Sequence, residues 1–534
     1  MRFLLKQGTI IDGTGADRYV ADLLIDGQRI AAIGQDLAVN DAIVIDVAGH
    51  VVAPGFIDTH SHSDLKVLLD PKVEPKIRQG ITTEFLGQDG VAMAPLPLAY
   101  IQPWRKNLAG LDGDSDLIDW TYQTTANYLN MIDHVKPSVN TGYLAPHGNI
   151  RMAAMGLDNR QPTAAELAKM CQIMRGEMAA GAFGLSTGLI YMPCAYSRTE
   201  EIIELCKVVA EYDGVFVVHQ RSEADTILES MAEVIRIGRE SGVRIHFSHF
   251  KVCGRKNWNK LDHMFELLEK AQAEGIRVSF DAYPYVAGST MLGVILPPWV
   301  HDGGTDQAMA RLADPQLRIK MIADIENGIP GWDNFIEFAG LDQIFVTSVT
   351  RPGNAACVGK SLAEIAVMRG QDVYNATFDL LLDEQNAVGM VDFYGTEDHI
   401  KRMLSRPEMN ACTDGLMAGK PHPRVFGAFP RILGQYVREE QTVSLEVAVR
   451  KMSGKPADVF SLKDRGYLKP GYFADITVFD PATIIDQGTF ADPIHDPVGI
   501  TCVFVNGGLA LQNGRMDQPA GTGRVLRFEP AKPT

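Results

Sequence analysis

The sequence predicts an α/β protein: a closed (β/α)8 barrel of the TIM type joined to a small β-sandwich built from both chain termini. Three observations lead to this prediction. Apolar β-type runs alternate with helical patterns through most of residues 54–464, as in parallel sheets. Residues 1–53 and 465–534 instead show short β patterns separated by glycine turns. Neither end could bury much surface alone, so we expect the two halves to combine.

The composition is typical of a protein that works in water. The chain has 534 residues, of which 46% are hydrophobic and 22% charged, and its net charge is −16. Such an acidic chain has no electrostatic reason to bind nucleic acid or an anionic membrane. No run reaches the roughly 18 apolar residues that a membrane span needs, and the N-terminal apolar run is too short for a signal peptide.

The pattern of cysteines indicates the kind of cellular compartment in which the protein works. Seven of them are scattered along the chain without a CxxC pair, which predicts mostly buried free thiols in a reducing environment. We therefore expect a cytoplasmic protein, and a homo-oligomer is left open.

The terminal sheet is expected to be antiparallel. Its predicted strands are 3–6, 10–11, 21–25, 29–33, 42–47, 474–479, 500–505 and 509–512.

The barrel elements follow from apolar runs bounded by capping and turn residues. Thr163 followed by Glu166 forms a capping-box pattern that predicts a helix to about residue 180. The rhythm breaks over about 286–350, which we interpret as an insertion that could cover the barrel mouth. The expected strands are 81–86, 138–144, 184–187, 215–219, 244–249, 277–281, 387–391 and 409–413, and the other expected helices are 199–212, 223–241, 261–274, 308–327, 361–369, 377–385 and 444–453.

Two histidines after the first barrel strand suggest a metal site. His60 and His62 are two residues apart, so both rings can face one space at a strand end. Neutral imidazole is the commonest metal ligand. A bare His-x-His pattern is short, and a pair of surface histidines at a turn is the alternative.

Further candidate ligands follow later strands. His219 and His249 each end a predicted strand, where a barrel places its active groups. A hydrogen-bonded core histidine is the alternative for either one alone. His246 is a rival ligand, but its odd spacing from His249 puts it on the opposite face of the strand.

Two aspartates and two basic residues complete the candidates. Asp414 follows the last strand, where a carboxylate beside metal-bound water can act as a general base. Asp89 follows the second strand and could be an oxygen ligand, even one that bridges two metals. Either aspartate could instead be a simple turn residue. Lys251 and Arg424 could line the pocket and hold a carboxylate, although lone basic residues are usually solvated surface charges.

Together these residues resemble the metal-dependent amidohydrolase superfamily and, within it, the D-aminoacylase (N-acyl-D-amino-acid deacylase) family. Any one motif is weak, but their order along nearly the whole chain is specific. The motifs lie at residues 55–62, 80–84, 184–191, 219–221, 248–251, 281–285, 413–415, 422–424 and 429–434.

The resemblance implies a barrel with a small β-sandwich, zinc as the metal and particular roles for individual residues. It makes His60, His62, His219 and His249 metal ligands and Asp414 the catalytic aspartate. The residues that would hold the substrate, notably its carboxylate, are Tyr191, Lys251, Tyr283, Ser289 and Arg424.

The chain departs from the family pattern at two points. Many members carry a metal-binding cysteine where this chain has Asp89, so one or two zinc ions per chain remain possible. Members specific for acidic D-amino acids carry an arginine shortly after the region of Ser289, whereas residues 291–296 here are Met-Leu-Gly-Val-Ile-Leu. An apolar substrate side chain is therefore expected.

The resemblance thus predicts zinc-dependent hydrolysis of the linear amide of an N-acyl-D-amino acid. One alternative is a cyclic-amide hydrolase of the hydantoinase or dihydroorotase type. Those enzymes resemble this fold but use a carboxylated lysine, and residues 184–187 offer none. A second alternative is a non-catalytic scaffold, which would be expected to lose ligands that this chain retains.

Overall fold

The computed structural model describes residues 1–516 and 521–529. Parallel strands of two sheets alternate with helices, which confirms the predicted α/β class. The first sheet holds β6 (Phe56–Asp58), β7 (Ile81–Leu86) and β8 (Asn140–Tyr143). The second has the order β17-β13-β12-β11-β10-β9, and its strands are β9 (Ala145–Pro146), β10 (Gly184–Gly188), β11 (Val215–His219), β12 (Arg244–Phe247), β13 (Val278–Ala282) and β17 (Met409–Ala411).

The two sheets are joined at both ends. Only Leu144 separates β8 from β9 along the chain. At the other end, the segment after β17 pairs with the segment after β6. The Asp414 N–H donates to the His60 carbonyl at 2.9 Å, and Ser61 forms a parallel bridge with Gly415.

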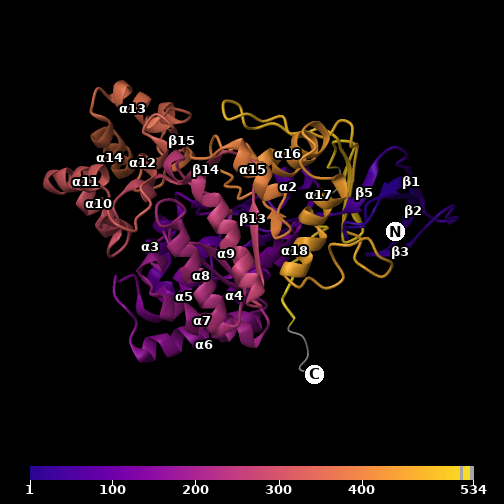
Figure 1. The fold of residues 1–534 in the computed structure, drawn as a ribbon, viewed down its shortest axis with the longest axis horizontal. Helices are drawn as coiled ribbons and strands as arrows, with labels where there is room; N and C mark the ends of the chain where they lie inside the picture. The colour runs from indigo at the N-terminus through magenta and orange to yellow at the C-terminus, as the bar shows by residue number, and fades with distance from the viewer. Residues whose placement is uncertain (517–520, 530–534) are drawn as a thin grey trace.

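Helices cover the outside of these strands (Figure 1). The predicted capping box is present, because the Thr163 and Glu166 side chains each bond the other's backbone at the start of α6. The covering helices are α4 (Thr125–Val135), α5 (His147–Met155), α6 (Ala164–Ala180), α7 (Thr199–Glu211), α8 (Ile227–Ser241), α9 (Leu261–Ala273), α15 (Glu397–Leu404), α17 (Leu445–Met452) and α18 (Gly454–Val459).

The predicted start of the helix after β11 was wrong, and the helix expected from residue 377 begins at Val373. We expected a helix from Glu223, but α8 begins at Ile227. The Asp333 carboxylate accepts the Ser222 hydroxyl and the Glu223 N–H, both at 2.6 Å. This tertiary contact holds the segment before α8 as a loop and leaves the Glu223 side chain beside the ends of the parallel strands.

The insertion is larger than the sequence indicated. The strand expected near 387–391 does not return to the parallel strands: it is β16 (Gly389–Phe393), which pairs antiparallel with β14 (Ala287–Met291) and β15 (Ile344–Ser348). A continuous apolar run looks the same in either sheet, so the sequence could not separate them. The helices of this lobe are α10 (Thr305–Ala313), α11 (Pro315–Asn327), α12 (Phe335–Ala339), α13 (Leu362–Arg369) and α14 (Val373–Asp383).

The lobe has its own core, so the helices predicted at 361–369 and 377–385 belong to it. Leu362 and Ile365 of α13 pack with Phe378 and Leu381 of α14 and with Met390 of β16. The single helix expected over 308–327 is divided into α10 and α11 at Asp314-Pro315, because proline has no N–H and Asp314 caps the second helix. Figure 1 shows this lobe at one end of the molecule and the terminal strands at the other.

Both chain ends contribute to one eight-stranded sheet. Its order is β20-β19-β18-β5-β1-β2-β3, with β4 pairing β1. We expected an antiparallel sheet, but β1 runs parallel to both β4 and β5, so the sheet is mixed. The strands are β1 (Arg2–Ile10), β2 (Tyr19–Asp26), β3 (Arg29–Gly34), β4 (Ile43–Asp46), β5 (Val51–Pro54), β18 (Ile476–Phe479), β19 (Ile500–Val505) and β20 (Gly508–Gln512).

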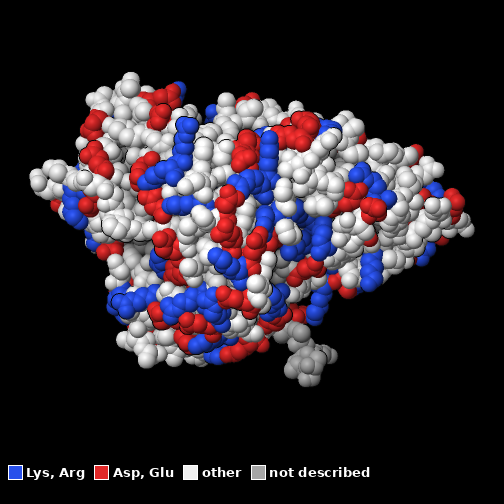
Figure 2. All heavy atoms as spheres, viewed as in Figure 1, with Lys and Arg blue, Asp and Glu red and all other residues white. Residues whose placement is uncertain are grey.

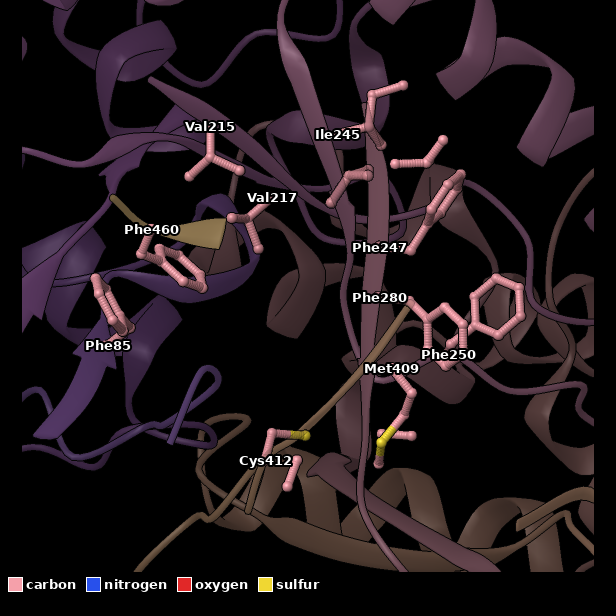
Figure 3. Packing of buried hydrophobic residues seen from close by; sticks show 14 of the residues in the cluster. Phe85, Val215, Val217, Ile245, Phe247, Phe250, Phe280, Met409, Cys412 and Phe460 are labelled. Carbon is pink, nitrogen blue, oxygen red and sulfur yellow. The ribbon is translucent and has the colours of Figure 1, made fainter. Parts of the chain in front are cut away.

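Aromatic and aliphatic side chains pack tightly around the parallel strands (Figure 3). The rings of Phe250 and Phe280 stack at 4.5 Å between centroids, and those of Phe85 and Phe460 at 3.9 Å. Such close-packed neighbours fix where each strand ends, and therefore where the side chains that follow it point.

Two further sequence expectations concern the cysteines and membrane spans. All seven cysteines are free thiols, and all but Cys171 are buried, as predicted. Within residues 1–516 and 521–529, no helix is both long and apolar enough to cross a membrane. Acidic and basic side chains are interspersed on the face shown in Figure 2.

The buried carboxyl of Glu177 in α6 should make the stability of the folded protein depend on pH. Its carboxyl is buried, and burial raises its pKa to about 7 from an ordinary 4.5. The folded state then holds the proton more tightly than the unfolded state, so stability falls as pH rises from about 4.5 to about 7. Glu177→Gln should remove this loss. The free energy of unfolding of the variant relative to the parent chain, measured with urea, should therefore rise by about 2 to 3 kcal/mol from pH 5 to pH 8.

The control is Glu229→Gln, which changes an exposed glutamate of α8. It should show no such gain with pH. An equal stability difference between Glu177→Gln and the parent at both pH values would contradict the prediction.

Candidate metal centre

Six predicted side chains meet at the carboxyl ends of the parallel strands. They follow or end five different strands, and all are at least 95% buried. They are His60 and His62 after β6, Asp89 after β7, His219 at the end of β11, His249 after β12 and Asp414 after β17.

The first half of the centre joins the His-x-His pair to both aspartates. The Nε2 atoms of His60 and His62 are 3.3 Å apart. Asp89 Oδ2 lies 3.6 and 3.5 Å from these two nitrogens, and Asp414 Oδ1 lies 3.7 and 3.5 Å from them. His60, His62 and Asp414 therefore offer three ligand atoms within 4.8 Å of one another.

The second half brings in the later strands. His219 Nδ1 lies 2.9 Å from His249 Nε2, which in turn lies 3.8 Å from Asp89 Oδ1. That Asp89 oxygen is buried and has no hydrogen-bond partner within the described residues. Imidazole nitrogens and carboxylate oxygens at this spacing suit a divalent cation such as zinc, which would satisfy the unpaired oxygen.

The backbone is unusual at three of these residues. Asp89, His249 and Asp414 have φ angles of 55°, 32° and 49°, in the left-handed region that non-glycine residues rarely adopt. Each residue lies two or three positions after the end of a strand. The left-handed turn lets the chain leave the strand while its side chain still points into the centre, and such local strain is typical of functional sites.

His246 lies outside this group, as the strand parity predicts. Its Nε2 is 2.9 Å from Asp281 Oδ2 and its Nδ1 is 2.8 Å from the Ser279 hydroxyl. Asp281 also accepts the backbone N–H of His249 at 2.5 Å and the Thr59 hydroxyl at 2.9 Å. His246 and Asp281 thus fix the neighbouring strands against each other.

Both aspartates are ionised in this environment. Burial alone would raise the pKa of Asp89, but the surrounding histidines hold it well below its ordinary value. Burial likewise opposes ionisation of Asp414, and the Arg424 guanidinium, 2.9 Å away, holds the pKa of Asp414 below its usual range. A charged carboxylate pair is what a cation at this position would require.

The predicted substrate residues lie beside the centre. Tyr191, Lys251, Tyr283 and Ser289 line a cavity of about 30 Å³ together with side chains of the metal centre. The Tyr283 hydroxyl contacts the Tyr394 hydroxyl at 2.7 Å, and the Ser289 hydroxyl donates to the Met390 carbonyl.

Arg424 is placed differently from the other substrate candidates. It is fully buried and does not line this cavity. Its guanidinium pairs with Asp414, donates to the Ser289 carbonyl at 3.0 Å and stacks over the Tyr283 ring at 4.3 Å. Arg424 thus supports the cavity wall and the aspartate.

A larger cavity of about 190 Å³ adjoins the first and shares Tyr191 and Phe335 with it. Its walls are mostly apolar and come from both the loops that follow the parallel strands and the inserted lobe. They include Leu189, Met291, Val294, Leu296 and Trp332.

Two further residues of the centre were missed from the sequence. Glu223 lies 3.1 Å from His249 Nδ1, and Asp112 lies 3.4 Å from His62 Nδ1. Glu223 follows His219 by four residues, a spacing that could have drawn attention to it, but we placed it in a helix. Asp112 belongs to an irregular stretch with no periodic signal, so its position could not be predicted from the sequence.

A buried ion cluster fixes the first and last of the parallel strands relative to each other. The Lys76 ammonium, which is fully buried, donates to Asp58 Oδ2 at 2.5 Å, to the Ser61 hydroxyl at 2.8 Å and to the Thr413 hydroxyl at 2.9 Å. Asp58 also accepts the Thr413 N–H at 2.8 Å. Ser61 stands between His60 and His62, and Thr413 precedes Asp414, so the cluster sets the distance between these ligands.

Comparison with known proteins places this geometry in context. The model of the amidohydrolase family matches residues 43–509. A D-aminoacylase from Alcaligenes xylosoxydans xylosoxydans is 37% identical over 512 residues, which cover 94% of this chain and 93% of the relative. An N-acyl-D-glutamate deacylase from the same organism is 35% identical over 506 residues, covering 94% and 92%.

Solved structures of deacylases also match this chain over nearly its whole length. The N-acyl-D-glutamate deacylase of Bordetella bronchiseptica, crystallised with zinc and a phosphonate mimic of the tetrahedral intermediate, matches with a TM-score of 0.84 and 35% identity over 98% of this chain and 99% of that one. A D-aminoacylase with a binuclear metal centre matches with a TM-score of 0.82 and 36% identity over the same shares. An L-hydantoinase from Arthrobacter aurescens, at 16% identity, 98% and 99% coverage and a TM-score of 0.57, shares the fold.

Proposed function

Since this chain belongs to the amidohydrolase family, we propose that it is a zinc-dependent hydrolase of N-acyl-D-amino acids. It would cleave the linear amide bond and release a carboxylate and a free D-amino acid. The observation that carries this proposal is the meeting of four histidines and two aspartates beside a cavity that presents Lys251. Relatives that are 35–37% identical over most of this chain include a D-aminoacylase and an N-acyl-D-glutamate deacylase.

The metal would be held by His60, His62, Asp89, His219 and His249. Bound zinc polarises a water molecule and a substrate carbonyl and stabilises the negative charge that develops on the carbonyl oxygen. The chain offers two overlapping three-residue groups around His60, one with His62 and Asp414 and one with Asp89 and His249. One or two ions are compatible with this arrangement.

Asp414 is proposed to move the proton. Its carboxylate takes a proton from the attacking water and later gives it to the leaving amide nitrogen, so that the amine departs neutral. The ion pair with Arg424 keeps Asp414 ionised and fixes its orientation before the reaction. A base that is already charged and oriented needs little reorganisation in the transition state.

The substrate carboxylate is proposed to bind Lys251, Tyr283 and Ser289 in the smaller cavity. Arg424 adds positive charge behind Tyr283 and Ser289, although its own nitrogens contact Asp414 and the Ser289 carbonyl. Tyr191 stands between the two cavities, with its hydroxyl 2.8 Å from that of Thr290. Fixing the carboxylate orients the amide relative to the metal.

An apolar D-amino-acid side chain is the preferred substrate feature. The larger cavity lies next to the centre, and Met291, Val294 and Leu296 contribute to its wall. These residues belong to the 291–296 segment that contains no arginine. A hydrophobic wall gains free energy from burying an apolar side chain and would leave a charged one without a partner.

The proposal includes the architecture. We propose a closed eight-stranded barrel over about 54–464, supported by the Asp414–His60 backbone hydrogen bond and the Ser61–Gly415 bridge. Residues 1–53 and 465–534 would form the accompanying β-sandwich domain, of which 517–520 and 530–534 lie outside the described residues. A cytoplasmic location is proposed from the free cysteines.

A cyclic-amide hydrolase is the second candidate. It is favoured only by the fold that this chain shares with hydantoinases. β10, where the resemblance to those enzymes would require a carboxylated lysine, has the sequence Gly-Leu-Ser-Thr-Gly. A non-catalytic scaffold is not supported, because all four histidines and both aspartates are present.

A hydrolysis screen tests the function directly. Zinc-loaded protein should release free amino acid from N-acetyl-D-leucine or N-acetyl-D-methionine, and far less from the L-enantiomers, N-acetyl-D-glutamate or dihydrouracil. Removing the metal with a chelator should abolish the activity, and added zinc should restore it. Preferential opening of dihydrouracil would contradict the proposal.

Substitution of Asp414 tests the proton transfer. Asp414→Asn keeps the size of the side chain but removes the proton acceptor, so kcat should fall by about three orders of magnitude or more. Zinc content should remain near that of the parent chain, because the histidines are intact. Near-normal turnover by a zinc-loaded variant would exclude the role.

A further inference from the structure

We propose that Glu223 is a positioning residue that fixes the ring tautomers of His219 and His249, so that both present a lone pair to the metal. The inference rests on the zinc centre of the proposed function and extends it to a residue behind the ligands. Glu223 is 96% buried in the loop between β11 and α8.

The carboxylate faces the outer nitrogen of each ring. Its Oε1 lies 3.1 Å from His249 Nδ1, and its Oε2 lies 3.7 Å from His219 Nε2. The opposite nitrogens, His249 Nε2 and His219 Nδ1, lie 2.9 Å apart and face the centre. One carboxylate therefore stands behind two ligands that come from neighbouring strands.

A neutral imidazole carries one N–H and one lone pair. If the outer nitrogen carries the proton, the inner nitrogen is free to bind a metal. His219 Nε2 has no hydrogen-bond partner within the described part of the chain, and the Glu223 carboxylate, 3.7 Å away, is the acceptor that we assign to its proton. A carboxylate behind a ligating histidine is a common way to set this tautomer.

Lys251 makes the choice of tautomer consequential for His249. Its Nζ lies 2.7 Å from His249 Nδ1 and 2.7 Å from Glu223 Oε2. If the ammonium donates to Nδ1, the ring proton sits on Nε2 and points at the metal position. Glu223 opposes this state, because its Oε2 accepts from the ammonium at 2.7 Å and its Oε1, 3.1 Å from Nδ1, offers an acceptor for an Nδ1 proton, which leaves Nε2 free.

The loop is built to hold Glu223 in this place. Asp333 of the inserted lobe accepts the Glu223 N–H and the Ser222 hydroxyl, both at 2.6 Å. The lobe that covers the centre thus fixes the backbone of the residue that orients two of its ligands. Glu223 also ties Lys251, the proposed substrate residue, to the metal centre.

Zinc affinity of the metal-free protein tests the inference without any substrate. Zinc binding would be measured by competition with a chelator of known affinity. Glu223→Gln should weaken zinc binding about 10- to 100-fold, because one amide oxygen cannot accept from three donors. Adding Lys251→Met to Glu223→Gln should restore most of the affinity, because the competing donor to His249 Nδ1 is gone.

The matched control is Glu201→Gln. Glu201 also stands behind a buried histidine, with its Oε1 2.9 Å from His147 Nε2, but His147 is not part of the centre. The zinc affinity of the Glu201→Gln variant should stay within about twofold of that of the parent chain. Thermal unfolding of each metal-free variant confirms that it is folded.

Two results would overturn the inference. One is an unchanged zinc affinity in folded Glu223→Gln. The other is a loss of affinity that Lys251→Met does not reverse, since a merely structural role for Glu223 predicts no rescue by removing a second residue. A parent chain that binds no zinc would instead overturn the proposed function itself.

Discussion

The structure depends on one buried ammonium group. Lys76 is fully buried and uses its three N–H donors on Asp58, Ser61 and Thr413, which belong to the first and last of the parallel strands and the turns that follow them. A buried charge is costly unless it is paired and hydrogen-bonded, so this cluster tolerates little displacement. Ser61 stands between His60 and His62, and Asp414 follows Thr413. The same contacts that hold the sheet ends together therefore set the separation of the ligands.

Asp89, His249 and Asp414 reach the centre by the same local conformation. Two or three residues after a strand ends, the backbone adopts a left-handed conformation and the side chain points inward. Carboxylates then stand behind the ligands: Asp112 behind His62, and Glu223 behind His219 and His249. Because Glu223 is held by Asp333, the inserted lobe contributes to the chemistry as well as to the cavity walls.

The sequence predicted the strand ends well because apolar runs followed by a polar residue identify them directly. His219 and His249 were found in this way, and the spacing of His246 excluded it. Contacts that depend on distant segments could not be predicted. The Lys76 cluster joins residues more than 300 positions apart, Asp112 lies in an irregular stretch, and Glu223 was placed in a helix because nothing local revealed its contact with Asp333. β16 was assigned to the wrong sheet for a related reason, because an apolar run does not show which strands it pairs with.

Diffraction from a zinc-containing crystal, recorded on both sides of the zinc absorption edge, tests the central claim most directly. The account predicts one or two anomalous peaks among His60, His62, Asp89, His219 and His249, each at about 2.0 to 2.2 Å from the nitrogen and oxygen atoms that bind it. Anomalous density that lies only elsewhere on the molecule, with these side chains left unliganded, would contradict it.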